Sequence, residues 1–287
     1  MPLHPSIQAH LQGAKDRFAA IAVLALAILP ALAGSAGAAE LPTLSVTLNT
    51  SSIVVGTPPA AGAVNVKSTA TGLKEPTTVL LLLKPSVSFV EVTAYLATNE
   101  ASKDPNTAEK YGTIVFDAED AGGKGEAQTS LAAGQYLAFN AEGPKSSAWH
   151  TTSFTVQPSS APTPLPAAAA VEKAIDFNFR GPSILHVGEL VGFENEGYVV
   201  HMNIAFPVRN HKAALKLVKA LKKGSKQAEK LIAGPPVTFE GPVSHGAYQQ
   251  SVIAAKPGVY VQVCFMDTED GRAHALLGME RIIRIVK

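Results

Sequence analysis

The chain has 287 residues, of which 46% are hydrophobic, with 24 basic side chains against 23 acidic ones. This length allows one large domain or two of ordinary size, with an ample core in either case. The net charge of +1 excludes the basic surface with which nucleic-acid-binding proteins neutralise phosphates, so we expect no nucleic-acid partner. A single cysteine excludes an intramolecular disulfide framework and cysteine-rich metal sites, and leaves room for a site with one thiolate.

Residues 1–39 have the layout of a secretory signal peptide. Lys15 and Arg17 precede the apolar run Phe18–Gly34, and small residues follow it as at a cleavage site. The alternative is a membrane anchor, but Pro30 interrupts the run, which is shorter than the roughly 20 residues that a membrane-spanning helix needs. We therefore expect an exported protein that is periplasmic, secreted or associated with the cell surface and has no membrane span after cleavage.

From Leu41 onward the sequence has an all-β texture, with short runs of Val, Thr, Leu and Phe broken by Gly, Pro, Asn and Ser. Residues 40–157 form a first module, and its short runs with turn signals between them predict a β-sandwich. The strands predicted there are Leu44–Leu48, Val79–Leu83, Val87–Leu96, Thr113–Phe116, Gln135–Asn140 and Ser153–Val156. The same texture returns in residues 171–287, with predicted strands at Ile175–Phe179, Leu190–Phe193, Val199–Phe206, Ser251–Ala254, Val259–Phe265 and Arg281–Val286.

A segment rich in proline and alanine, residues 158–170, separates the two modules. Four prolines fall between Pro158 and Pro166, and this density favours an extended, semi-rigid chain. The second module also contains a stretch with helical periodicity. We therefore predict an all-β protein of two Greek-key β-sandwich modules, the second with a short helical insertion.

The helical stretch is Lys212–Leu231, which has apolar residues at helical spacings and an interruption at Gly224. It carries seven lysines and one acidic residue, Glu229. One interpretation is a docking patch for an acidic partner or an anionic surface. The other, which we favour, is a solvated helix that packs on the sandwich through its leucines while lysine stems cover apolar surface.

Four residues of the second module form a set that metal chemistry uses. His201 lies on a predicted strand, Cys264 ends another, and His274 and Met279 follow a polar loop. A soft thiolate and two imidazoles hold copper in a trigonal plane with a weakly bound thioether on the axis, which is the ligand set of a blue-copper site. Each of these side chains, taken singly, is more often a core residue than a ligand. The prediction of a metal site therefore rests on the four residues occurring together in this order and spacing.

The motifs around these residues resemble the cupredoxin superfamily of blue-copper, plastocyanin-like proteins. The motifs similar to its N-terminal half are Asp176–Phe179, Gly188, Val191, Phe193–Gly197 and His201. Those similar to its C-terminal half are Gly258-x-Tyr260 and Cys264 with His274-x4-Met279. The resemblance covers residues 171–287, with the lysine-rich stretch as an insertion.

This resemblance implies one copper ion (Cu+/Cu2+) per chain. His201, Cys264 and His274 would be its equatorial ligands and Met279 its axial ligand. Nine residues separate Cys264 from His274, a longer loop than small cupredoxins have. Met202 stands directly after the first histidine, where the family often has asparagine.

The first module repeats part of this signature. Gly134–Tyr136 parallels Gly258–Tyr260, and Asn140 then takes the position of the thiolate. His150 follows ten residues later, and Thr155 takes the position of the methionine. A neutral amide does not replace a soft thiolate. We therefore predict a degenerate copy that binds no copper in this way and serves as a scaffold or docking module.

Three functions are compatible with these features. The first is an exported cupredoxin-like protein that passes single electrons, with an edge of His274 toward solvent and the acidic loop Asp267–Asp270 suited to steering a basic redox partner. The second is a copper storage or delivery protein of the same fold. The third is a metal-free β-sandwich binding module at the cell surface, in which Cys264 is simply buried.

We expect no enzymatic activity. The sequence has no G-x-S-x-G elbow, no H-E-x-x-H helix and no P-loop. It also lacks the clustered His-x-His pairs of multicopper oxidases. A copper ion in this chain is therefore expected to serve transfer or storage rather than turnover of a substrate.

Overall fold

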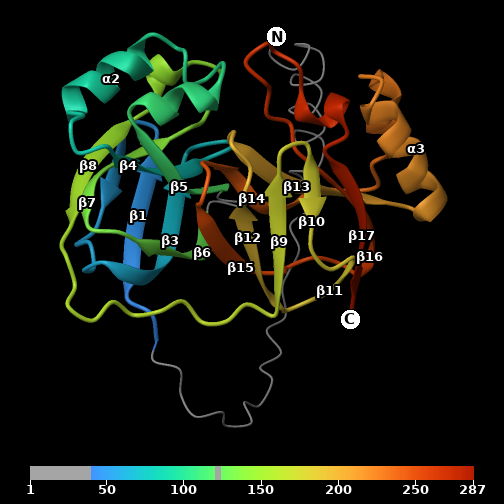
Figure 1. The fold of residues 1–287 in the computed structure, drawn as a ribbon, viewed down its shortest axis with the longest axis horizontal. Helices are drawn as coiled ribbons and strands as arrows, with labels where there is room; N and C mark the ends of the chain where they lie inside the picture. Colours follow the sequence, from blue (N-terminus) through green and yellow to red (C-terminus); the bar gives the residue numbers. More distant parts are fainter. Residues whose placement is uncertain (1–39, 120–123) are drawn as a thin grey trace.

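The computed structural model describes residues 40–119 and 124–287, which form two β-rich halves side by side (Figure 1). Strands dominate both halves, which confirms the all-β prediction. The predicted signal peptide at residues 1–39 lies outside the described residues. Within the described ranges, no helix is both long enough and apolar enough to cross a membrane.

The first half starts with a strand that alternates as a half-buried strand should. Leu44, Val46 and Leu48 are buried, and their neighbours in the strand are more exposed. The strands of this half are β1 (Thr43–Asn49), β2 (Ser52–Val55), β3 (Gly62–Thr71), β4 (Thr77–Leu83), β5 (Gly112–Glu119), β6 (Lys124–Leu131), β7 (Gly134–Asn140) and β8 (Thr151–Val156). Its helical segments are α2 (Phe89–Ala97), η1 (Pro105–Lys110) and η3 (Ser146–Ala148).

The second half contains the remaining strands and the basic helix. Its strands are β9 (Ala170–Ile175), β10 (Asn178–Arg180), β11 (Ile184–His186), β12 (Leu190–Asn195), β13 (His201–Val208), β14 (Val237–Val243), β15 (Tyr248–Val252), β16 (Gly258–Val263) and β17 (Glu280–Val286). Its helical segments are α3 (His211–Leu221), η4 (Lys226–Leu231) and η5 (His274–Leu277).

The two halves have the same strand order. One sheet of the first half runs β5-β4-β7-β8, and the corresponding sheet of the second half runs β14-β13-β16-β17, with β11 added at its edge. The opposite layers match as well, because β1 pairs in parallel with β3 as β9 does with β12. β2 and β10 are the antiparallel edge partners of β1 and β9. This shared plan agrees with the repeat predicted from the Gly-x-Tyr motifs.

One continuous sheet joins the halves. β15 pairs antiparallel with β6, so the sheet runs β10-β9-β12-β15-β6-β3-β1-β2. Two strands that would otherwise expose unpaired backbone groups satisfy each other at this joint. The buried amide of Gln249 strengthens it, since its Nε2 donates to the carbonyl of Asp117 at 2.9 Å and its Oε1 accepts from the Asp117 N–H at 3.0 Å.

The proline-rich segment is tied to both halves. The N–H of Ala63 donates to the carbonyl of Thr163 at 2.8 Å, and Nε2 of Gln250 donates to the carbonyl of Pro166 at 3.0 Å. Regular structure resumes at Ala170, where β9 begins. The segment therefore has fixed contacts along its course, and the domain boundaries at residues 158–170 stay a prediction.

The predicted strand Val87–Leu96 is wrong, because these residues form helix α2. Ser88 caps the helix, and Glu91 completes a capping box with it. Val92, Tyr95 and Leu96 are buried, which is the i, i+3, i+4 pattern of an amphipathic helix. The β-branched residues of the segment favour a strand. Its capping box and the helical spacing of its buried residues favour a helix and outweigh that preference.

The prediction of one strand over Ile175–Phe179 is also wrong. β9 ends at Ile175 and β10 begins at Asn178, and these two residues pair across a tight hairpin. Phe177 in the turn has a φ of 64°, a backbone conformation that is uncommon outside glycine. The turn contains no glycine or proline, so the usual sequence signal of a hairpin is missing.

The helical insertion is confirmed. Asn210 caps α3, with its side chain accepting from the N–H of Ala213 at 3.0 Å. Gly224 has a φ of 57° and ends the helical run, as its position in the sequence predicts. α2 occupies the equivalent place in the first half, between β4 and β5, as α3 does between β13 and β14.

Candidate metal centre

Three buried side chains from distant parts of the second half meet at one end of its sandwich. Sγ of Cys264 lies 3.7 Å from Nδ1 of His201 and 3.4 Å from Nδ1 of His274. The three donor atoms all lie within 4.8 Å of one another. Among the described residues, this is the one group of histidine, cysteine and carboxylate side chains whose donor atoms converge in this way.

Neighbouring strands bring these residues together. His201 is the first residue of β13 and Cys264 directly follows β16, and the pairing of Ile204 with Val263 sets the two strands in register. Met279 directly precedes β17, which pairs with the other edge of β16. Its side chain is fully buried in the same apolar cluster as Cys264. The sheet therefore carries three of the four predicted ligands at its end.

The long loop between Cys264 and His274 closes on itself like a small hairpin. Asp267 and Ala273 form an antiparallel bridge, and the N–H of His274 donates to the carbonyl of Met266 at 2.8 Å. The nine intervening residues therefore bring His274 back to the cysteine. The loop is longer than in small cupredoxins, but it delivers the second imidazole to the same thiol.

Asp176 fixes the orientation of His201. Its Oδ1 lies 3.0 Å from Nε2 of the imidazole, so the N–H at Nε2 donates to the carboxylate and Nδ1 keeps its lone pair for a metal. Burial acts against the charged carboxylate, but hydrogen bonds from the Tyr198 N–H and from His201 hold the pKa of Asp176 below its ordinary value. Asp176 lies in the hairpin turn between β9 and β10, a turn that the sequence did not predict.

Gly197 allows this close approach. A Cβ at this position would lie 2.4 Å from Oδ1 of Asp176 and 2.6 Å from Nε2 of His201. Both distances are far below any normal contact, so a side chain cannot fit without moving the pair. Gly197 falls within the Phe193–Gly197 motif, but the motif does not predict this contact.

The backbone of Met202 supplies a hydrogen bond to the thiol. Its N–H donates to Sγ of Cys264 at 3.4 Å. Asn203 is fully buried, and within the described part of the chain neither atom of its amide has a hydrogen-bond partner. The tie between the two ligand segments therefore comes from a backbone amide rather than from an asparagine side chain.

The protonation states suit metal binding by the two histidines. Burial lowers the pKa of His201, and burial together with the neighbouring His201 lowers the pKa of His274 to about 4. Both rings are therefore neutral at pH 7 and each offers a lone pair. Burial raises the pKa of Cys264 to about 12, so a metal must displace the thiol proton when it binds.

The donor set fits a copper ion. A small transition-metal ion held at about 2.0 Å from nitrogen and about 2.3 Å from sulfur, as zinc is in proteins, would separate the two donors by about 3.7 Å at trigonal angles. The observed separations of 3.4 Å and 3.7 Å are close to this spacing. One thiol, two imidazoles and the buried thioether of Met279 form a soft set that copper prefers over hard cations.

The expected solvent-facing edge of His274 is wrong. Its side chain is fully buried, and Nε2 has no hydrogen-bond partner among the described residues. The ring of Phe177 packs edge-on against it with centroids 5.0 Å apart. Phe177 reaches His274 from the turn between β9 and β10, where the sequence predicted a continuous strand.

The first half has no corresponding group of donors among its described residues. Asn140 is buried, and its Oδ1 accepts from the N–H of Thr77 at 3.0 Å. His150 instead contacts the carbonyl of Thr50 at 3.0 Å through Nε2. The structure therefore places the predicted degenerate residues in backbone-supporting roles.

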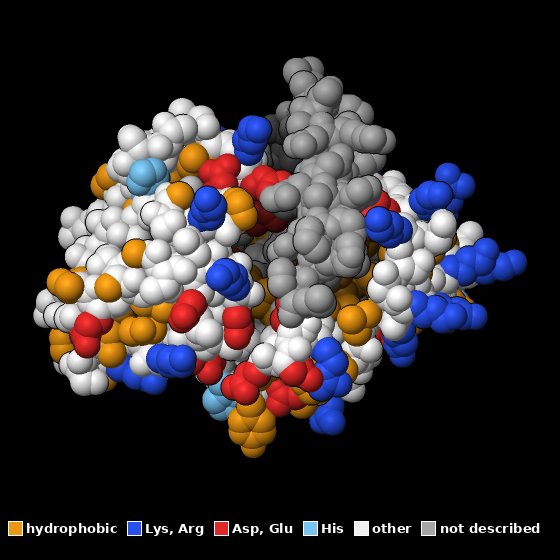
Figure 2. All heavy atoms as spheres, turned by 90° about the horizontal axis from the view of Figure 1, so that it is seen from above, with side chains coloured by type: hydrophobic (Ala, Val, Ile, Leu, Met, Phe, Trp, Pro, Cys, Tyr) orange, Lys and Arg blue, Asp and Glu red, His pale blue; other side chains and the backbone are white. Residues whose placement is uncertain are grey.

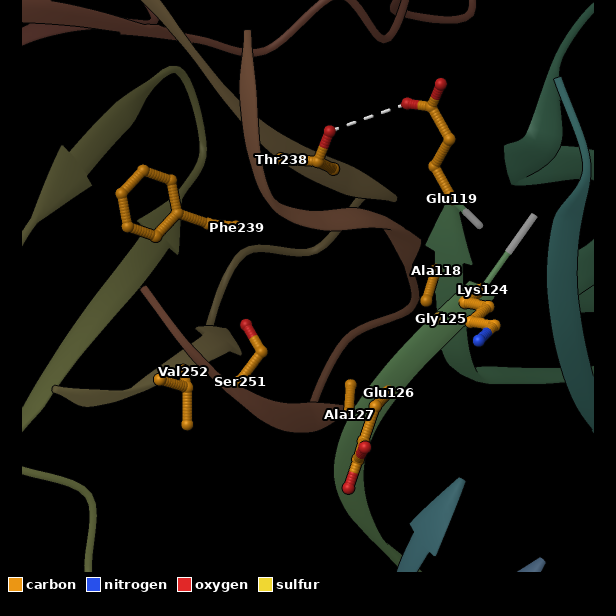
Figure 3. A pocket seen from close by; sticks show the side chains of 10 residues that line it. All are labelled: Ala118, Glu119, Lys124, Gly125, Glu126, Ala127, Thr238, Phe239, Ser251 and Val252. Atoms are coloured by element: carbon orange, nitrogen blue, oxygen red, sulfur yellow. Dashed lines mark hydrogen bonds between the residues drawn. The ribbon is translucent and has the colours of Figure 1, made fainter. Parts of the chain in front are cut away.

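A hollow at the joint between the halves holds none of these residues. It has a volume of about 180 Å³ and is lined by parts of β5, β6, β14 and β15 (Figure 3). Thr238 and Glu119 face each other across it, with a hydrogen bond of 3.5 Å between their side chains. The described residues that line it include no histidine or cysteine, and the candidate metal centre lies elsewhere.

No protein-family model and no curated protein matches the chain. The solved structures that it resembles include auracyanin A, a "blue" copper protein from Chloroflexus aurantiacus, with 17% identity, a TM-score of 0.25, and coverage of 40% of this chain and 96% of that one. Auracyanin B has 19% identity, a TM-score of 0.26, and coverage of 43% and 93%. The Cu-containing nitrite reductase NirK from Thermus scotoductus has 11% identity, a TM-score of 0.24, and coverage of 86% and 68%.

Auracyanin A and the nitrite reductase are copper proteins. Their identities and TM-scores are low, and the description of the centre rests on the distances within this chain. Those distances bring together three of the four predicted ligands and bury the fourth beside the cysteine. The described part of the chain has an all-β fold of two halves with the same strand order, and a candidate metal centre lies in its second half.

Proposed function

We propose that this protein binds one copper ion through His201, Cys264, His274 and Met279, and passes single electrons. The observation that carries the proposal is the convergence of one thiol and two imidazole nitrogens within 4.8 Å in a fully buried site. A purely structural sandwich gains nothing from burying two imidazoles, because burial of polar rings costs free energy. Copper held by this set supplies a one-electron couple.

The residues around the ligands favour a rigid site. Asp176 holds the ring of His201 by its Nε2–H, and the Met202 N–H donates to the thiol. Phe177 packs against the ring of His274 and excludes water from it. Groups that are fixed before metal binding need little rearrangement when the charge of the centre changes, which favours electron transfer.

The second candidate is a copper carrier or store with the same site. The burial of His274 favours it, because an electron reaches a metal most readily through an exposed ligand edge. The same burial slows the exchange of a bound ion with solution, which suits a store better than a carrier. The two functions therefore differ in what passes quickly to a partner. An electron-transfer protein exchanges its electron quickly, and a copper carrier exchanges its metal ion quickly.

The charge near the centre favours an acidic redox partner over a basic one. Lys and Arg side chains gather over α3 (Figure 2). Nζ of Lys222, at the end of this helix, pairs with Oε1 of Glu280 at 2.9 Å, directly beside Met279. In the acidic loop, Asp270 is already paired with Arg272 at 2.7 Å. The loop Asp267–Asp270 therefore offers less free negative charge than its sequence suggests.

The first experiment is titration of the metal-free protein with Cu(II), followed by visible absorption and electron paramagnetic resonance. We expect one equivalent to bind, with an intense thiolate-to-copper band and narrow hyperfine splitting. Cys264→Ser should abolish the band, whereas His186→Ala, a histidine outside the centre, should leave it unchanged. A colourless protein that takes up no stoichiometric copper would refute both copper functions and favour the metal-free binding module.

A second experiment separates transfer from carriage. The copper-loaded protein is reduced in a stopped-flow instrument by hexacyanoferrate(II), and its metal is separately challenged with a chelator. Electron transfer predicts reduction within milliseconds to seconds and metal loss over hours. The acidic-partner proposal further predicts that added salt slows reduction by this anionic reagent, because salt screens attraction to the lysines of α3. Slow reduction with rapid metal loss would establish a carrier instead.

A further inference from the structure

A side chain of the first half lies between the two loops that carry the ligands. Asn106 in η1 accepts through Oδ1 from the N–H of Val200 at 2.7 Å. Its Nδ2 donates to the carbonyl of Asp267 at 3.2 Å. Val200 directly precedes His201, and Asp267 lies in the loop that joins Cys264 to His274. One amide therefore connects both ligand segments across the boundary between the halves.

The position of this amide is itself fixed. Oδ1 of Asp104 accepts from Nδ2 of Asn106 at 2.8 Å and from its backbone N–H at 3.0 Å. Asp104 is the N-cap of η1, and Pro105 follows it at the start of the turn. The Val200 bond requires an oxygen at one end of the amide and the Asp267 bond requires a nitrogen at the other. All hydrogen-bonding groups of the side chain are therefore committed to one orientation.

Apolar contacts reinforce the same connection. Val200 is fully buried in a hydrophobic cluster of the first half that includes Val92 and Tyr95 of α2. Met266, from the loop after Cys264, packs against this cluster as well. The segments that carry the ligands of the second half thus have part of their core in the first half.

We propose that Asn106 is a positioning residue of the metal centre, and that the first half holds the two ligand segments in register. This inference rests on the proposed copper function for its spectroscopic consequence, but not for its effect on the metal-free loops. It assigns a role to the first half. Through Asn106, its η1 turn holds the backbone of Val200, which precedes His201, and the backbone of Asp267 in the loop before His274. The amide contacts neither ligand and acts through the backbone on both sides.

The test compares Asn106→Leu with Thr107→Val in the full-length protein. Leucine has nearly the same size as asparagine but removes both bonds across the boundary. Thr107 is its neighbour in η1, and its hydroxyl bonds only within the first half, to Tyr95 at 2.6 Å and to the carbonyl of Asp104 at 2.7 Å. The control thus loses two hydrogen bonds of the same turn without touching either ligand segment. Asn106→Ala serves as a second variant that introduces no added bulk.

Hydrogen exchange of the metal-free protein gives the first readout. In Asn106→Leu we expect the Val200 amide to exchange at least about tenfold faster, because it loses its acceptor, with faster exchange in the loop from Met266 to His274. Thr107→Val should leave both segments as protected as in the parent protein. Equal protection of these segments in all variants would overturn the inference whether or not copper binds.

The copper-loaded protein gives the second readout. We expect Asn106→Leu to broaden the hyperfine pattern, alter the ratio of its visible bands and speed copper loss about tenfold to a hundredfold, the range typical of residues that orient metal ligands. Thr107→Val should keep the parent spectrum even where it lowers the melting temperature. A parent spectrum and parent metal loss in Asn106→Leu would refute the positioning role. If neither the parent protein nor any variant binds copper, the proposed function is refuted. Hydrogen exchange of the metal-free protein would still decide whether Asn106 holds the two segments in place.

Discussion

The two halves share a backbone plan and a stabilising detail. The hydroxyl of Tyr136 donates to the carbonyl of Ala132 at 2.9 Å, and that of Tyr260 donates to the carbonyl of Lys256 at 2.7 Å. Each tyrosine lies near the start of equivalent strands, β7 and β16, and reaches back four residues. A preserved bond of this kind at matching positions argues that the scaffold is the same in both halves.

The halves diverge four residues after each tyrosine. In the first half, Oδ1 of Asn140 accepts a hydrogen bond from the backbone N–H of Thr77, the first residue of β4. In the second, Cys264 faces His201 and His274. One strand position therefore serves backbone support in one half and the candidate metal chemistry in the other. The scaffold tolerates the exchange because both side chains are small, buried and at the end of a strand.

The interiors differ as well. β1 buries Leu44, Val46 and Leu48, all apolar, whereas β9 buries the carboxyl of Glu172. Oε2 of Glu172 accepts from Arg281 at 2.8 Å and from Gln262 at 3.2 Å. Its Oε1 has no partner within the described residues. The second half thus buries a carboxyl on β9, whereas the matching strand of the first half, β1, buries apolar side chains alone.

The largest expected effect comes from giving the second half the residue of the first. Cys264→Asn removes the thiolate, so we expect loss of the intense visible band and at least a hundredfold weaker copper binding, measured by competition with a chelator. The reverse change, Asn140→Cys, is the control and should create no band, because the described residues of the first half contain no group of converging donors and the ring of His150 contacts a backbone carbonyl. A band that survives Cys264→Asn would contradict the assignment of the thiol.

Glu172 should give the second half a pH dependence of its stability that has no counterpart at the matching strand of the first half. Burial raises its pKa to about 7, against about 4.5 for an unfolded chain, with Arg281 and Gln262 opposing the rise. Below about pH 4.5 both states hold the proton and the contribution to stability is complete. Between pH 4.5 and 7 the unfolded state loses its proton first, so the free energy of unfolding falls by up to about 3 kcal/mol.

Urea unfolding of the metal-free protein between pH 4.5 and 8 measures this fall. Glu172→Gln keeps the size of the side chain and cannot ionise, so its difference from the parent protein should grow across this range and be constant above pH 7. The difference isolates Glu172 from other carboxyls that titrate in the same interval, such as Asp267, whose pKa burial raises to about 6. Parallel curves for the two proteins would show that the carboxyl titrates normally.

Gly197→Ala should weaken the centre by displacing the pair that orients His201. The added methyl would lie within 2.6 Å of both Asp176 and the imidazole. Loss of a carboxylate partner to a ligand histidine typically costs about ten- to a hundredfold in metal affinity. Gly234→Ala is the matched control, because a methyl there meets only Pro207 at an ordinary 3.5 Å. Equal copper affinity in the two variants would exclude a role for the Asp176 bond.

Sequence reasoning predicts more than half of the strands, because alternation and turn residues are local signals, but it misses β3, β6 and β14. It also predicts the set of candidate ligands, which stays a prediction. The period-two pattern of Leu44–Leu48 and the spacing of Cys264, His274 and Met279 need no knowledge of distant contacts. The error at Val87–Leu96 could have been avoided, since the capping box of Ser88 is visible in the sequence.

The residues that position the site could not be predicted in the same way. Asp176 reaches His201 only because an unsignalled turn at Phe177 bends the chain. Asn106 reaches Val200 from 94 positions earlier, across the boundary between the halves. The contact of Asn106 depends on how the two halves join, and the sequences of β6 and β15 do not show that these two strands pair.

The smallest expected effect is also the most direct comparison of the two scaffolds. Tyr136→Phe and Tyr260→Phe each remove one hydroxyl and leave one backbone carbonyl without its partner, so each should cost about 0.5–1.5 kcal/mol in the free energy of unfolding. Urea unfolding of the metal-free variants measures both. Equal losses would mean that the halves are equivalent as scaffolds and differ only in their chemistry. A loss confined to Tyr260→Phe would mean that the metal-free half has relaxed, and that the bond is needed only where a site must be held rigid.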